Sequence, residues 1–187
     1  MVELRFVEYD EAVHKADYIE MFVEYGKWLD KHVLDHYGVP LFQNDIRETT
    51  LGYIPHITPI KPPEGINLVL MVDGKNAGMA RFDKFDEGIG MIHNVFIYSE
   101  FRGKSYSKQM MDVIEEKARD YGYKLLRLDT SGRNVVSQNL YKKRGYVEIE
   151  RFTDFENLKN EVTRPYYLEK VYMEKQLHSD DFILTSP

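Results

Sequence analysis

The chain has 187 residues, of which 43% are hydrophobic and 30% charged, and its formal net charge is −6. This length and composition predict a single globular domain over residues 1–187 with a sizeable core. The acidic balance argues against a general nucleic-acid binder, because no basic surplus exists to neutralise phosphates. The absence of cysteine excludes disulfides, thiolate metal sites and cysteine nucleophiles.

The sequence also argues against membrane insertion. It has no run of eighteen or more apolar residues. Its first residues, MVELRFVEYDEAV, lack the basic and apolar regions of a signal peptide. We therefore expect a cytoplasmic protein without a membrane partner.

The first third of the chain predicts a strand followed by helices. Apolar and polar residues alternate over residues 2–9, as in a strand. Asp10 can then cap a helix. Apolar residues recur at helical spacing after it, at Val13, Tyr18, Met21, Phe22, Tyr25 and Leu29. Residues 31–63 show no clean period, and we expect a short helix near 44–51 and then a loop.

The middle of the chain predicts an antiparallel meander. An apolar run over residues 67–72 is followed by Asp73-Gly74, which indicates a tight hairpin turn. The return strand is expected over 77–82. A second turn near 86–88 then leads into a strand over 90–98.

The last part of the chain predicts helices and strands in alternation. A helix over residues 105–121 carries an apolar stripe and stops at Gly122. A strand follows over 124–130, and then a short helix over 134–143. Further strands are expected over 146–152 and 166–175. The whole pattern is typical of a mixed α/β domain.

The segment EFRGKSYSKQMM contains Gly-Lys-Ser at 103–105, which are the last three residues of a nucleotide-binding P-loop. The first glycine of that motif would have to stand at Tyr98, so the pattern disfavours an ATP site. The unpaired N–H groups of a helix start can instead bind a pyrophosphate, with Arg102, Lys104 and Lys108 as cationic donors. An ordinary basic helix start on the surface is the alternative.

Three segments, in their order and spacing, resemble the GNAT superfamily of N-acetyltransferases, which move an acetyl group from acetyl-CoA to an amine. The segments are HNVFIYSEFRGKSYSKQMM, LLRLDT and NVVSQNLYKKRGYVEI. Upstream, PPEGINLVLMVDGKNAGMARF is similar to the second and third strands of the family. The resemblance implies the GNAT fold, a central mixed and mostly antiparallel sheet of about six to seven strands flanked by helices.

The resemblance also implies acetyl-CoA as cosubstrate and assigns residues to it. The strand before the loop would pair its backbone with the pantetheine arm, and the loop would hold the pyrophosphate. The residues in these positions are Val95, Phe96, Ile97, Arg102, Gly103, Lys104, Ser105, Tyr106, Ser107, Asn134 and Tyr141. Ser105 and Ser107 stand where the family has glycines. A positive φ at Ser105 would store strain on the order of 1 kcal/mol or more, whereas a helical serine costs little. Asn134 can equally serve as a helix N-cap.

By the same resemblance, Tyr141 is the general acid that protonates the departing CoA thiolate. A phenol with a pKa of ~10 is protonated at neutral pH. His93 is our candidate for the base, because it shares a strand face with Val95 if no bulge intervenes. The alternatives are a packed helix tyrosine and a hydrogen-bonded strand histidine without a catalytic role. Many family members have a glutamate at the position of Met91, which cannot act as a base.

The acceptor is expected to be a small-molecule or peptide amine. Tyr25 and Trp28 offer aromatic surface, and Asp129 at a strand end could pair with an ammonium group. Core packing is the alternative for the aromatic residues. His32 and His36 could share an ion, but no third ligand is evident, so we expect no metal. A catalytically silent CoA-binding sensor or regulatory module is the rival function, and a homodimer is an expectation from the family alone.

Overall fold

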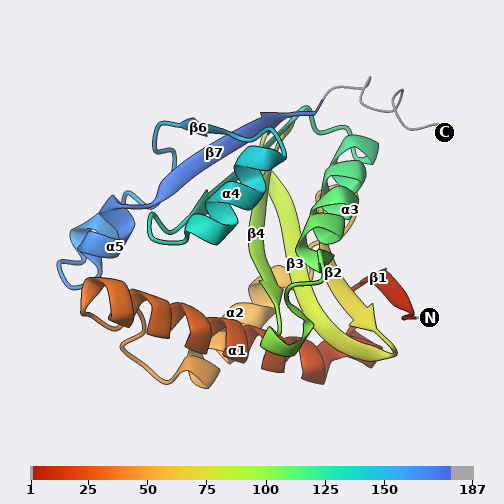
Figure 1. The fold of residues 1–187 in the computed structure, drawn as a ribbon, viewed down its shortest axis with the longest axis horizontal. Coiled ribbons are helices and arrows are strands. Elements are labelled where there is room, and N and C mark those ends of the chain that lie inside the picture. Colours follow the sequence, from red (N-terminus) through yellow and green to blue (C-terminus); the bar gives the residue numbers. More distant parts are fainter. Residues whose placement is uncertain (1, 178–187) are drawn as a thin grey trace.

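A computed structural model describes residues 2–177 of the chain and shows a seven-stranded sheet between two layers of helices (Figure 1). The strands are β1 (Leu4–Glu8), β2 (Gly65–Val72), β3 (Lys75–Asp86), β4 (Ile89–Ile97), β5 (Leu125–Thr130), β6 (Val147–Ile149) and β7 (Val171–Gln176). Their order across the sheet is β1-β2-β3-β4-β5-β7-β6. Every neighbouring pair is antiparallel except β4 and β5. The expected mixed, mostly antiparallel sheet is therefore confirmed.

The helices cover the two faces of the sheet with separate apolar clusters. They are α1 (Glu11–Tyr37), α2 (Ile46–Ile57), α3 (Tyr106–Asp120), α4 (Val135–Lys143) and α5 (Arg164–Leu168), with short 3-10 turns η1 (Ser99–Phe101) and η2 (Asn157–Lys159). Met110 and Ile114 of α3 pack on one face, together with Tyr141 of α4. Tyr18 of α1 and Ile54 of α2 pack on the other face. Within residues 2–177, no helix has the length and apolarity that a membrane crossing needs.

Four segments differ from the predicted helix and strand bounds. The first helix continues to Tyr37 and ends where Gly38 takes a left-handed φ of 73°, a cap that the mixed polar sequence before it did not reveal. The second helix runs on to Ile57. The strand predicted over 166–175 is wrong in its first half, because α5 occupies Arg164–Leu168 with Pro165 in its first turn. The strand predicted over 146–152 shrinks to Val147–Ile149.

The sheet opens between β4 and β5, and this opening positions the site. The two strands pair only where Ile89, Gly90 and Met91 face residues 125–127. Beyond that point β4 contains a bulge, because the register with β3 shifts and Asn94 has a positive φ of 53°. The second half of β4 is therefore not paired by β5.

Candidate active site

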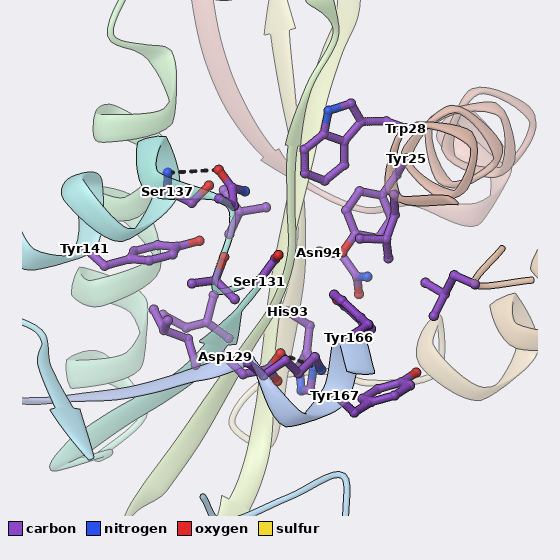
Figure 2. A pocket seen from close by; sticks show the side chains of 18 residues that line it. Tyr25, Trp28, His93, Asn94, Asp129, Ser131, Ser137, Tyr141, Tyr166 and Tyr167 are labelled. Carbon is purple, nitrogen blue, oxygen red and sulfur yellow. Dashed lines mark hydrogen bonds and ion pairs between the residues drawn. The ribbon is translucent and has the colours of Figure 1, made fainter. Parts of the chain in front are cut away.

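Two cavities meet at the opening between β4 and β5. The larger, of about 770 Å³, lies between the end of β4, the start of α3 and α4. The smaller, of about 240 Å³, lies between α1, β4, β5 and α5 (Figure 2). Both cavities are lined by Trp28, Val95, Asn134, Ser137 and Tyr141. A molecule in one cavity can therefore meet a molecule in the other at these five residues.

The larger cavity ends at the loop before α3. Gly103 and Ser105 both have left-handed backbones, with φ values of 78° and 61°, and Ser105 is the N-cap of α3 without a side-chain cap bond. Ser107 lies inside the first turn of α3, where serine is tolerated. The side chain of Arg102 turns back onto β4, because its Nε donates to the carbonyl of Ile97 at 2.8 Å. Arg102 thus closes the loop onto the strand that precedes it.

Most of the residues predicted to hold the cosubstrate line the larger cavity. They are Val95, Phe96, Ile97, Arg102, Gly103, Ser105, Tyr106, Ser107, Asn134 and Tyr141. Lys104 is exposed on the loop and is not among the described residues that line this cavity. The side chain of Asn134 caps α4, since its Oδ1 accepts from the Ser137 N–H at 3.2 Å. The structure thus gives Asn134 the N-cap role and a place at the cavity junction together.

Tyr141 stands at the junction of the two cavities. Only 7% of its surface is exposed. Burial first, and then the nearby Tyr25 and Asp129, raise the pKa of its phenol well above the ordinary value. The phenol is therefore protonated across the physiological range, as a proton donor must be.

His93 lines the smaller cavity despite the bulge. The bulge at Asn94 breaks the simple alternation that would place His93 and Val95 on one strand face, yet both line this cavity. Nε2 of His93 lies 3.2 Å from Oδ1 of Asp83, which orients the ring. Burial alone would raise the pKa of Asp83, but His93 and Arg81 outweigh it and hold that pKa below the ordinary value.

The bulge is held by residues that sequence reasoning missed. Arg81 of β3 is 4% exposed, and its Nε donates to Oδ1 of Asn94 at 3.0 Å. Its other nitrogens donate to Asp83 and, at 2.7 Å, to the hydroxyl of Tyr53. Burial and the charge of a nearby carboxylate raise the pKa of Tyr25 to about 12, while a hydrogen bond with Asn94 lowers it. A charged pair two residues apart in an otherwise buried strand was the available signal.

Asp129 lines the smaller cavity but already has a cationic partner. Its Oδ1 lies 2.7 Å from Nζ of Lys170, which is also 2.7 Å from Asp154. Burial lowers the pKa of Lys170, but Asp129, Tyr166 and Asp154 outweigh it and raise that pKa above the ordinary value. An acceptor ammonium at Asp129 would therefore share the carboxylate with an ammonium of the protein itself.

The aromatic wall of the smaller cavity continues into the histidines of α1. Trp28 stacks on Tyr25 at 6.1 Å between ring centres and on His32 at 5.6 Å, and His36 follows at 4.5 Å. Tyr166 and Tyr167 of α5, which the sequence did not single out, complete the cavity. Within the described part of the chain, no three potential ligands come together to hold a metal ion.

Comparisons with known proteins agree with this geometry. The model of the acetyltransferase (GNAT) family matches residues 20–146. An uncharacterized N-acetyltransferase of Bacillus subtilis, YycN, is 30% identical over 59 residues, which cover 32% of this chain and 38% of the relative's own length.

Solved structures share the fold. A GNAT-family acetyltransferase of Staphylococcus aureus has a TM-score of 0.67 at 14% identity, covering 94% of this chain and all (100%) of that one. The yncA protein of Salmonella typhimurium, solved with its cofactor acetyl-CoA, has a TM-score of 0.63 at 14% identity, covering 99% and 98% of the two chains. Because the family model matches more than half of its length, this chain belongs to the GNAT family of acetyltransferases.

Proposed function

We propose that this protein is an acetyl-CoA-dependent N-acetyltransferase that moves the acetyl group directly to a primary amine. The observation that supports this most is the meeting of two cavities at Tyr141 and Val95. One cavity has the loop and helix start that suit a pyrophosphate, and the other is a small aromatic chamber. The thioester would lie where they join. The two apolar clusters share one sheet, which supports a single domain for the described residues 2–177.

The larger cavity fits acetyl-CoA by its chemistry. The N–H groups at the start of α3 suit the pyrophosphate, and the edge of β4 from Val95 to Ile97, which β5 does not pair, suits the amides of the pantetheine arm. An N–H group of the same opened strand can polarise the thioester carbonyl. Asn134 and Tyr141 would then lie beside the reacting end.

The chemistry would divide between two side chains. His93, oriented by Asp83, takes a proton from the amine nitrogen as the nitrogen attacks the thioester carbon. The carbon–sulfur bond breaks, and Tyr141 gives its phenolic proton to the departing thiolate. No covalent acyl-enzyme is needed, and no cysteine is present to form one.

The acceptor would occupy the smaller cavity. Its volume of about 240 Å³ favours a small amine, or the end of a peptide, over a bulky one. Tyr25 and Trp28 supply the walls, and Asp129 lies on the same cavity.

Calorimetric titration with acetyl-CoA, with ATP and Mg²⁺ as the control, tests the cosubstrate. We expect acetyl-CoA to bind and ATP with Mg²⁺ to show no binding. Tyr141→Phe then tests the enzyme against the silent sensor: kcat should fall by about 10²-fold or more with acetyl-CoA affinity unchanged. Tyr146→Phe is the matched control, since this buried neighbour, 5.8 Å away between ring centres, lines neither cavity. Unchanged turnover in Tyr141→Phe would contradict the assigned role.

A further inference from the structure

The proposed reaction requires two protons to leave the acceptor nitrogen. A primary ammonium carries three N–H bonds, and the amide product carries one. One proton must leave before attack, because an ammonium has no lone pair. A second leaves as the carbon–nitrogen bond forms. One of the two ends in solvent, and the other replaces the proton that Tyr141 gives to sulfur.

The smaller cavity is lined by a hydroxyl group that contacts a second histidine besides His93. Ser131, directly after β5, lines this cavity and is 5% exposed. Its Oγ lies 2.8 Å from Nε2 of His32 on α1. The hydroxyl also accepts from the N–H of Arg133 at 3.2 Å. That bond uses an oxygen lone pair and leaves the hydroxyl proton free to point to Nε2 of His32, in the tautomer that has its own proton on Nδ1.

We propose that Ser131 and His32 form a proton exit that removes the first proton from the acceptor ammonium. The ammonium gives a proton to Oγ of Ser131 as Ser131 gives its own proton to Nε2 of His32. The nitrogen regains its lone pair for attack, and His32 becomes an imidazolium. This inference rests on the proposed function, and it leaves the second proton to His93.

The surroundings of His32 suit an acceptor that returns its proton to water. Burial first, and then the charge of His36, lower the pKa of His32, while Asp35 raises it in part. The ring is therefore neutral at physiological pH. Its other neighbours are the ring of Trp28 and, across Ser131, the hydroxyl of Tyr37 at 3.4 Å from Oγ. His32 is half-buried rather than fully enclosed, so its imidazolium can return the proton to water directly.

The charged groups behind Ser131 are already paired. Arg133 is exposed, and its Nε lies 2.8 Å from Glu169. The backbone carbonyl of Ser131 accepts from the side chain of Gln138 at 3.0 Å, which fixes the residue at the mouth of β5. The Gln138 contact thus holds the backbone of Ser131, and the Arg133 N–H and His32 hold Oγ.

The test compares acceptors that need this exit with acceptors that do not. Alkylamines are ammonium ions at neutral pH, whereas aromatic amines are already neutral. We measure kcat/KM for a panel of each with wild type, Ser131→Ala and His32→Gln. The ratio of alkylamine to aromatic-amine kcat/KM should fall about 10- to 100-fold in both variants. Ser131→Thr, which keeps a hydroxyl, should restore the ratio.

Two controls separate the exit from structural damage. His36→Gln alters the same aromatic stack one turn away and should keep the wild-type ratio. His93→Gln should slow both acceptor classes alike, because both lose a proton during attack. An unchanged ratio in Ser131→Ala and His32→Gln overturns the exit. A wild type that binds acetyl-CoA but acetylates no amine of either panel overturns the proposed function itself, and the exit with it.

Discussion

Backbone strain at Ser105 can be measured directly by replacing it with glycine. Its φ of 61° is left-handed, and its side chain makes no cap bond to α3, so glycine loses no capping hydrogen bond there. A non-glycine residue in this conformation costs about 1–3 kcal/mol. The greater freedom of glycine in the unfolded chain offsets about 0.5–1 kcal/mol of that. We expect Ser105→Gly to raise the free energy of unfolding by about 1 kcal/mol.

Urea unfolding of the wild type and two single variants measures this effect. For a chain of this size, about 1 kcal/mol corresponds to a rise in Tm of about 2–4 °C. Ser107→Gly is the matched control, because Ser107 has a helical backbone in the first turn of α3. There glycine should lower stability by about 0.5–1 kcal/mol. If both variants shift stability in the same direction, the strain argument is refuted.

Two buried ion pairs lie beside the smaller cavity and can be tested by substitution. Lys170→Met should lower the free energy of unfolding by about 3–5 kcal/mol, because removal of the ammonium, whose side chain is 10% exposed, takes the cationic partner from two carboxylates. Lys159→Met removes an exposed ion pair instead and should leave the urea midpoint unchanged. Burial raises the pKa of Asp154, but Lys170 and hydrogen bonds outweigh it and hold it below the ordinary 3.8. Its contribution to stability is therefore complete above pH 3.8 and is lost as pH falls below that value. Asp154→Asn should flatten this acid limb in urea unfolding measured across pH, and an unchanged limb would contradict the shift.

The sheet was predictable because local signals there agree with the fold. The turn at Asp73-Gly74 and the helix stop at Gly122 require left-handed backbones, which aspartate and glycine both tolerate. The prediction for residues 166–170 failed for the opposite reason. A strand was expected there, but Pro165 starts a short helix, and Lys170 forms ion pairs with two carboxylates from distant segments.

The site was predictable only where the motif and its spacing are local. Tyr141 and the loop before α3 belong to contiguous segments, so resemblance could point to them. Arg81 is brought by β3–β4 pairing to Asn94, which lines the smaller cavity, and Ser131 meets His32 across 99 positions of the chain. No periodicity reports a contact of that separation. The positive φ of Asn94 likewise arises from the bulge rather than from a turn signal.

The bulge in β4 is braced from β3 by Arg81. Buried Arg81 ties Asn94, Asp83 and Tyr53 together through its planar donor groups. A lysine keeps the charge beside Asp83 but has one ammonium and cannot reach all three partners.

Arg81→Lys should therefore lose about two hydrogen bonds and about 2–3 kcal/mol of stability. Without its bond to Arg81, Asn94 should let His93 shift in the smaller cavity, so kcat should fall while the affinity for acetyl-CoA is retained. Arg47→Lys, in an exposed pair with Glu20, is the matched control. If Arg81→Lys unfolds and turns over like wild type, the bulge is held by β4 itself, and the link between β3 and the cavity is wrong.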